Sequence, residues 1–281
     1  MTTEKTKVKE SGLAPGYLHG YSSEEQARLY KQARFLEPKV FEKIDFARSE
    51  RILEVGCGVG AQTEILLERF PQLRVQGIDA IAAQVERAKK HLAAAMQSGR
   101  ADFAVADALH LPYEDNTFDG AFVCWLLEHV QNPVNILREV LRTLKTSSVI
   151  YCTEVQHATF YVHPYSPATL QYWFTFNDHQ WSMKGDPFVG AKLGNYLTEA
   201  GFQNVKTEIS ALHYDNRSPK MRADCIEYWT NLLLSGVPGL QAAGKVTDTL
   251  VNEMKTELHR LKYDKDSVFF YAFVQARAEV F

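Results

Sequence analysis

The sequence lacks the long apolar runs and strongly basic stretches that mark several classes of protein. No apolar stretch approaches the ~20 residues needed to span a bilayer, and the N-terminus, Met-Thr-Thr-Glu-Lys-Thr-Lys, has no apolar signal core. We therefore expect a cytoplasmic protein with no membrane partner. The 31 basic and 34 acidic residues give a net charge of -3, with no basic run to attract a phosphate backbone. Nucleic acid is therefore not expected as a substrate.

Cysteine is scarce and dispersed along the chain. The four cysteines are Cys57, Cys124, Cys152 and Cys225, and no pair has the CxxC spacing of a zinc site. Thiols that are so far apart in the sequence are expected to be reduced in a reducing compartment. The sequence therefore predicts neither a disulfide framework nor a bound metal.

The remaining composition is that of a folded globular chain. Hydrophobic residues make up 46% and charged residues 23% of the 281 residues, so wholesale disorder is not expected. A chain of this length can bury one large core, and we expect one α/β domain with an added cap. Neither length nor charge decides the oligomeric state, and a homodimer is left open.

Short apolar runs alternate regularly with amphipathic stretches from residue 51 onward. This alternation predicts a Rossmann-like, doubly wound parallel sheet with helices on both faces. In such a sheet, ligands bind at the carboxyl ends of the strands. The seven expected strands are 51–55, 73–78, 103–105, 118–124, 149–154, 205–212 and 267–276, and the expected helices include 62–70, 81–96, 134–144 and 189–200.

Segments outside this alternation are expected to form the cap. A helix should begin near Ser23, because Ser22 and Glu25 have the spacing of a capping box, and should be interrupted near Pro38. An aromatic stretch at about 155–187 and a mostly helical stretch at about 216–262 interrupt the later strands. The aromatic side chains either form the core of a lid or form the wall of a site for an apolar or aromatic molecule.

The most informative segment is Ile52-Leu-Glu-Val-Gly-Cys-Gly-Val-Gly60, in which a strand runs directly into three alternating glycines. Glycines let the backbone turn tightly and approach a ligand closely. Gly56, Gly58 and Ala61 also fit the fingerprint of dinucleotide-binding proteins. Asp79 ends the next strand, where its carboxylate can accept hydrogen bonds from ribose hydroxyls in either class of cofactor.

Three further features distinguish the two cofactors. Glu54 precedes the glycines and can meet a cationic amino group, which a nicotinamide dinucleotide lacks. Asp107 and Ala108 follow the third strand and can meet the amino group and ring nitrogen of an adenine. The segment 118–129 then delivers Cys124, Trp125 and Leu126 to the same edge of the sheet. Together these features describe a nucleoside joined through sulfur to an amino acid.

In these motifs the chain resembles the class I S-adenosylmethionine-dependent methyltransferases, in the small-molecule branch similar to methyltransferase domain 11. The resemblance runs from about Arg51 to Glu154. One departure is the segment 144–149, where many relatives carry Pro-Gly-Gly. The resemblance implies S-adenosyl-L-methionine as cofactor and in-line transfer of its methyl group to a carbon, nitrogen, oxygen or sulfur atom of a small molecule, in a role in biosynthesis.

The resemblance also implies the layout of the chain and its site. Residues 1–46 would form a tail and a helix that covers the cofactor, and residues 47–281 would form the methyltransferase domain with both cap insertions. The expected cofactor-binding residues are Glu54, Gly56, Cys57, Gly58, Gly60, Gln62, Asp79, Ala80, Asp107, Ala108, Cys124, Trp125, Leu126 and His129.

Candidate catalytic residues follow from position alone. Glu154 and His157 leave the carboxyl end of the fifth strand, where they can contact the acceptor or take its proton. Tyr21 precedes the helix that is expected to cover the cofactor. Each has a structural alternative, which is a hydrogen bond within the fold for Glu154 and His157 and a surface turn for Tyr21. No metal is required, because a sulfonium methyl group is already activated.

Two other functions remain open from the sequence. A non-catalytic nucleotide-binding protein built on the same fold would share every motif. An NAD-dependent oxidoreductase would share the glycine loop and Asp79, but it would leave Glu54 and the segment 118–129 unexplained.

Overall fold

The computed structural model describes residue 20 and residues 22–281. Tyr21, a candidate catalytic residue, lies outside the described residues, as does the expected N-terminal tail. All four cysteines are buried free thiols. In the described part of the chain, no helix is long and apolar enough to cross a membrane.

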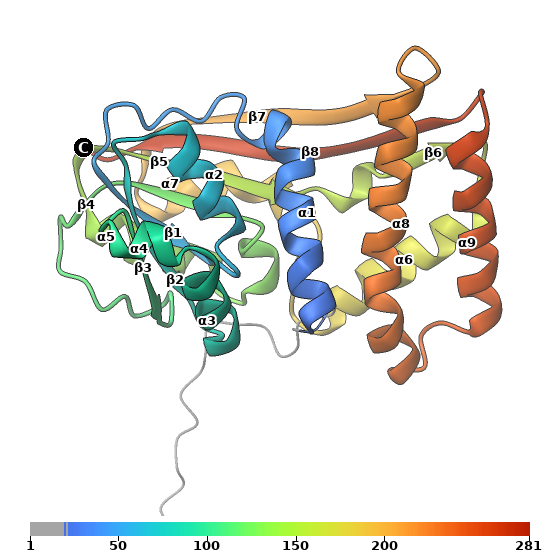
Figure 1. The fold of residues 1–281 in the computed structure, drawn as a ribbon, viewed down its shortest axis with the longest axis horizontal. Coiled ribbons are helices and arrows are strands. Elements are labelled where there is room, and N and C mark those ends of the chain that lie inside the picture. The colour runs from blue at the N-terminus through green and yellow to red at the C-terminus, as the bar shows by residue number, and fades with distance from the viewer. Residues whose placement is uncertain (1–19, 21) are drawn as a thin grey trace, which may run out of the picture.

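The described residues form one central sheet of eight strands, in the order β3-β2-β1-β4-β5-β8-β6, with β7 paired to β8 (Figure 1). The pairs from β3 to β5 are parallel, whereas β8 runs antiparallel to β5, β6 and β7. The Rossmann-like prediction is confirmed, with one strand more than expected. The strands are β1 Arg51–Val55, β2 Arg74–Asp79, β3 Ala101–Val105, β4 Phe118–Cys124, β5 Leu144–Val155, β6 Tyr161–His163, β7 Gln203–Tyr214 and β8 Val268–Glu279.

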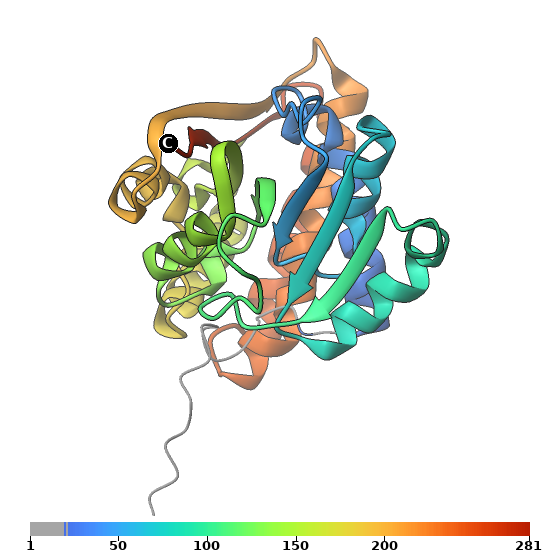
Figure 2. The same cartoon turned by 90° about the vertical axis from the view of Figure 1, so that its left-hand side faces the viewer.

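Helices cover both faces of this sheet (Figure 2). Alternate residues of one strand enter different cores, since successive side chains of a strand point to opposite faces. Ile52 packs with residues of α1, α2 and α3, while Leu53 packs with residues of α5 and α7. The helices are α1 Ser23–Val40, α2 Ala61–Arg69, α3 Ala82–His91, α4 Ala93–Gln97, α5 Pro133–Thr143, α6 Pro167–Ser182, α7 Leu193–Ala200, α8 Pro219–Ala242 and α9 Asp248–Tyr263, with 3-10 turns η1 Leu127–His129, η2 His157–Thr159 and η3 Val189–Lys192.

Two helix predictions need correction. α1 begins as expected, with the Ser22 hydroxyl accepting a hydrogen bond from the Glu25 amide, but it continues past Pro38 to Val40. Pro38 lies in the last turn, so little helix remains for it to disrupt. The helix expected over 81–96 is split at Leu92, whose backbone leaves the helical conformation.

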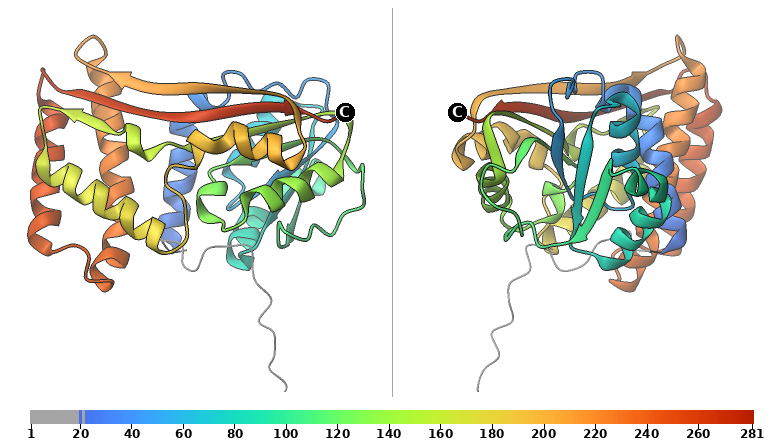
Figure 3. Two further views of the ribbon diagram at one scale, coloured as in Figure 1. Left: turned by 180° about the vertical axis from the view of Figure 1, so that it is seen from behind. Right: turned by 60° about the vertical axis from the view of Figure 1, so that its left-hand side comes forward.

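The two cap insertions meet beneath one end of the sheet. β7 and β8 extend beyond the parallel strands, and α6, α8 and α9 pack together under this extension (Figure 3). Aromatic residues form a core within the cap, in which Trp173 and Trp229 are buried against Phe160. One hydrophobic core runs from the sheet into the cap, with α1 between them. The cap and the sheet therefore share a core.

The packing of η3 against β5 generates a stability prediction. A Cβ added to Gly190 would lie 2.6 Å from the carbonyl oxygen of Val155, whereas one added to Gly194 in α7 would meet a Thr207 methyl group at 3.1 Å. Gly190→Ala should therefore lower the free energy of unfolding by about 1–3 kcal/mol, because backbone must move. Urea denaturation measures the change.

Gly194→Ala is the matched control. It places the same methyl group in a helix, where alanine is favoured over glycine by about 1 kcal/mol, so its free energy of unfolding should not fall. Equal stability of the two variants would contradict the assigned contact between η3 and β5.

Candidate active site

One cavity lies at the carboxyl ends of β1, β2 and β4 and is closed by α1 and the cap. Most of the expected cofactor residues line it. The lining residues include Arg28, Leu29, Ala33 and Leu36 of α1; Gly56, Cys57 and Gly58 of the glycine loop and Gln62 of α2; Asp79, Ala80, Asp107, Ala108, Cys124, Trp125, Leu126, Glu128, His129 and His157 at the strand ends and the turns after them; and Phe176, Gln180, Leu212, Tyr228, Trp229, Leu232, Tyr271 and Phe273 of the cap, β7 and β8.

The glycine loop joins β1 to α2. Gly56 and Gly58 adopt φ values of 77° and 51°, in the left-handed region where side chains are strained. A Cβ on Gly56 would also lie 2.9 Å from Leu126, while one on Gly58 would meet nothing within 4 Å. The loop is therefore packed on one side and open on the other. Gly60 has a φ of 80° and is not among the lining residues.

Asp79 fixes the glycine loop to the end of β2. Its two carboxylate oxygens accept hydrogen bonds from the Gly58 amide at 3.0 Å and the Ile81 amide at 2.8 Å. Burial raises the pKa of this carboxyl above its usual range, and these amide hydrogen bonds act in the opposite direction. Asp79 lines the cavity and still has lone pairs to offer.

Glu54 lies just before the loop and is fully enclosed. Its side chain accepts a hydrogen bond from the Thr63 hydroxyl of α2, a partner that no sequence motif marks. Burial raises the pKa of Glu54 to about 8. Because Glu54 is not among the lining residues, any contact with a ligand needs a small local opening.

The turn after β4 is held by Glu154. Trp125 adopts a φ of 56°, and one Glu154 oxygen accepts hydrogen bonds from the next two amides, Leu126 at 3.0 Å and Leu127 at 2.8 Å. Glu154 is 0% exposed and does not line the cavity. The expectation that it faces the substrate therefore needs correction, because the carboxyl group is turned to backbone amides.

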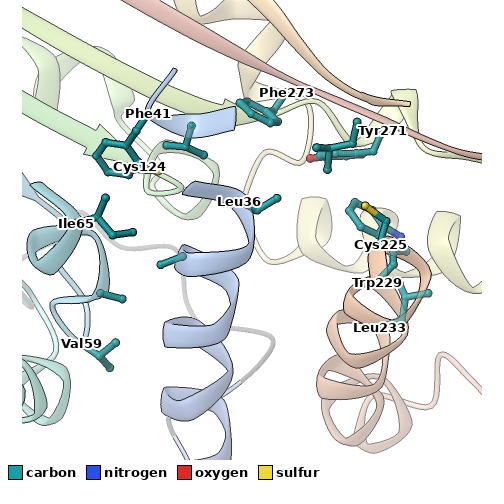
Figure 4. Packing of buried hydrophobic residues seen from close by; sticks show 14 of the residues in the cluster. Leu36, Phe41, Val59, Ile65, Cys124, Cys225, Trp229, Leu233, Tyr271 and Phe273 are labelled. Atoms are coloured by element: carbon teal, nitrogen blue, oxygen red, sulfur yellow. The ribbon is translucent and has the colours of Figure 1, made fainter. Parts of the chain in front are cut away.

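His157 does reach the cavity, and it brings partners from three other elements. Its Nδ1 lies 3.1 Å from the hydroxyl of Tyr271 on β8, and its Nε2 lies 3.8 Å from a Glu128 oxygen. Gln180 of α6 donates a hydrogen bond to that same oxygen at 2.8 Å. Figure 4 shows the hydroxyl of Tyr271 pointing toward Phe273 and away from Cys225.

Sequence reasoning missed three members of this group. Glu128 stands beside His129, and its oxygen lies 3.5 Å from the His129 ring, so the Glu-His pair was the available signal. Tyr271 and Gln180 are far from Glu128 in sequence, and no local pattern distinguishes them from core residues.

The ring of His157 is neutral at physiological pH. Desolvation by burial, with a smaller effect of nearby His129, lowers the pKa of His157 to about 3. The ring packs against Trp173, with centroids 4.6 Å apart, and the Trp173 indole donates a hydrogen bond to its backbone carbonyl. His157 is therefore an uncharged ring whose position is fixed by its neighbours.

Sequence comparisons now give the family of this chain. Residues 53–152 match a family model described as a methyltransferase domain. O-methyltransferase cnsE of Penicillium expansum is 30% identical over 208 residues, which cover 72% of this chain and 71% of the relative. The chain belongs to the class I S-adenosylmethionine-dependent methyltransferases. The 27-O-demethylrifamycin SV methyltransferase of Amycolatopsis mediterranei is 31% identical, over 45% of this chain and 46% of its own.

Solved structures agree on the fold. Phosphoethanolamine N-methyltransferase 2 of Haemonchus contortus, solved with phosphomonomethylethanolamine and S-adenosylhomocysteine, has a TM-score of 0.55 at 16% identity, and the match covers 89% of this chain and 52% of that one. The methyltransferase fold is thereby confirmed. As a member of this family, the protein transfers a methyl group from S-adenosylmethionine to a small molecule.

The cavity fits this cofactor. The Gln62 side-chain oxygen and the Trp125 indole nitrogen are buried and have no hydrogen-bond partner among the described residues. Both residues line the cavity, as do Asp79 and Asp107. A ligand that carries an ammonium group, a ribose and an adenine offers partners for such groups.

Glu54 generates a prediction about cofactor binding. With a pKa of about 8 in the free protein, its carboxyl is mostly protonated at pH 7, whereas a nearby ammonium group favours the carboxylate. S-adenosylhomocysteine should therefore release a proton on binding at pH 7 and bind more tightly as the pH rises from 6 to 8. Calorimetry in buffers of different ionisation enthalpy measures this proton.

Glu54→Gln should bind the same molecule without that proton release. Should the variant still release it, the proton comes from another group and Glu54 does not meet the amino group.

Proposed function

We propose that the protein methylates a hydroxyl oxygen of an uncharged, largely apolar or aromatic small molecule. The observation that carries this proposal is the position of His157. A neutral imidazole with a carboxylate on one side and a tyrosine hydroxyl on the other lies in the same cavity as the glycine loop.

The acceptor half of the cavity is apolar. Side chains of α1, the cap and β8 enclose it, and they are mostly aliphatic and aromatic. Apolar walls with a few polar groups favour ligands that bury a large apolar surface and present one or two polar atoms. The residues are Leu29, Ala33, Leu36, Phe176, Leu212, Trp229, Leu232 and Phe273.

The charge of the lining argues against a phosphorylated acceptor. Among the described lining residues, Arg28 is the one lysine or arginine. Its guanidinium already forms two hydrogen bonds to the Glu25 carboxylate, of 2.6 and 2.7 Å, and one to Gln32. The Glu25 carboxylate offsets the positive charge of Arg28, and a phosphate group is usually bound by more positive charge than remains.

A hydroxyl group must lose its proton when its oxygen is methylated, whereas an amine is already nucleophilic. A histidine in the cavity that can take this proton therefore favours a hydroxyl acceptor over an amine. When bound, S-adenosylmethionine supplies the methyl group. The proton that the acceptor hydroxyl loses would pass through the Tyr271 hydroxyl to Nδ1 of His157. Glu128 faces the other ring nitrogen and would favour the neutral ring form whose Nδ1 can accept a proton. The names of two relatives, which are O-methyltransferases, support the same atom.

For the cofactor, we propose contacts with the motif residues that line the cavity. Gly56, Gly58 and Gln62 would lie along the methionine part, Asp79 would hold the ribose, and Asp107 with Ala108 would hold the adenine. α1 would cover both the cofactor and the acceptor, since Leu29 and Leu36 line the cavity that holds them.

A substitution at His157 tests the proposal. The acceptors should include phenols, their methyl ethers and the corresponding anilines, each incubated with methyl-labelled cofactor and analysed by mass spectrometry. Phenols should be methylated, and His157→Asn should lower kcat by roughly 10²–10⁴. Affinity for S-adenosylhomocysteine should stay close to that of the wild type. His259→Asn, at an exposed histidine of α9, is the matched control and should keep full activity.

The pH profile gives an independent check. The neutral imidazole is the active form, and with a pKa of about 3 it persists at every pH above that value. The kcat of the wild type should therefore show no acid limb from His157 between pH 5 and 8. Wild-type kcat in His157→Asn, or methylation of anilines in preference to phenols, would show that proton transfer to this histidine is not part of the reaction.

A further inference from the structure

The turn between β4 and η1 is strained and fully enclosed on one side. Trp125 adopts a φ of 56°, a conformation that is an outlier for a bulky side chain. Such conformations persist only where surrounding contacts compensate their cost, and they cluster at functional sites. Trp125 lines the cavity, so the strained residue is also one that faces the ligand.

The compensating contacts come from β5. The Trp125 amide donates to the Thr153 carbonyl at 2.9 Å, which continues the pairing of β4 with β5. The next residue of β5, Glu154, then accepts the amides of Leu126 and Leu127 on one oxygen. A buried acceptor that satisfies two consecutive amides fixes the direction of the chain immediately after Trp125.

This turn contacts both the glycine loop on the cofactor side and His157 on the acceptor side of the cavity. Leu126 packs against the glycine loop, as its contact with the Cβ position of Gly56 shows. Glu128, two residues further, faces His157. A displacement of the turn would therefore move the wall of the cofactor cavity and the carboxylate beside the histidine together.

We propose that Glu154 is a positioning residue, which holds the turn after β4 in the left-handed conformation that presents Trp125 and Leu126 to the cofactor. The carboxyl contacts no ligand itself. Burial raises the pKa of Glu154 to about 8, so at neutral pH the group is mostly a neutral acid. A glutamine has the same shape and a similar carbonyl acceptor.

Two substitutions separate positioning from chemistry. Glu154→Gln keeps an oxygen that can accept both amides, so kcat and affinity for S-adenosylhomocysteine should stay within about threefold of the wild type. Glu154→Leu removes the acceptor and should weaken that affinity by at least about tenfold, since buried amides lose their partner. The binding measurement needs no acceptor molecule, so its result is independent of the proposed O-methylation.

Glu257 of α9 provides a matched control. Its carboxylate also accepts two consecutive amides, those of Ala168 at 3.1 Å and Thr169 at 2.8 Å, but it lies outside the cavity lining. Glu257→Leu should lower the Tm as Glu154→Leu does, while its affinity for S-adenosylhomocysteine, measured well below both Tm values, should not change.

A substitution at Trp125 tests the strain directly. Glycine adopts positive φ without strain. Trp125→Gly should therefore lower the Tm by less in the Glu154→Leu background than in the wild type. If Glu154→Leu does not fold, recovery of folding by Trp125→Gly supports the proposal, and failure to recover overturns it.

Three other results would overturn the proposal. The first is unchanged affinity in Glu154→Leu, and the second is an equal loss in Glu257→Leu. The third is a fall of more than about 100-fold in the kcat of Glu154→Gln with intact binding, which would show that the carboxyl takes part in proton transfer.

Discussion

The site depends on the length of β8. This strand has 12 residues, about twice the length of β1 or β2, and pairs first with β6 and then with β5 along one edge. Its other edge pairs with β7 throughout. Because β8 continues past the parallel strands, the cap helices have a sheet surface to pack on, and Tyr271 and Phe273 come to lie over the cavity. A shorter strand would leave the cap without its attachment to the core.

Three carboxyl groups lie at or behind the sheet side of the cavity. Glu54, Asp79 and Glu154 all have a pKa that burial raises above its ordinary value. Enclosing such groups costs free energy unless they are hydrogen-bonded or protonated, and here each is bonded to backbone amides or a hydroxyl. A cationic ligand lowers that cost. The arrangement therefore suits a cofactor that carries positive charge at both its sulfur and its amino group.

The acceptor side has a different character, because its polar groups are few and are tied to one another. Glu128, His157, Gln180 and Tyr271 form one connected group on an otherwise apolar wall. The methyl group is already activated and mainly needs alignment with the acceptor. Orientation by such a fixed group can therefore account for a large part of the lowering of the activation barrier.

Local chemistry in the sequence was sufficient to predict the central strands and most of the residues that line the cavity at the sheet edge. The strands 51–55 and 118–124 were predicted at their observed bounds, because apolar runs and glycines are local signals. The helix break at Leu92 and strand β6 were not predicted, because neither has a strong local signal. A helix break without glycine or proline and a strand of three residues leave little pattern in the sequence, and both depend on what packs against them.

The sequence by itself determined which residues meet at the ends of β1, β2 and β4, because parallel strands that are joined by helices must end at one edge. Only the tertiary structure decided what faces them. Glu154 and His157 are three residues apart, yet the carboxyl turns to the amides after Trp125 while the ring reaches Tyr271 and Glu128. The direction of each side chain is set by partners on other elements, which the pairing of β5 with β4 and with β8 brings beside it. No local pattern in the sequence predicts that pairing.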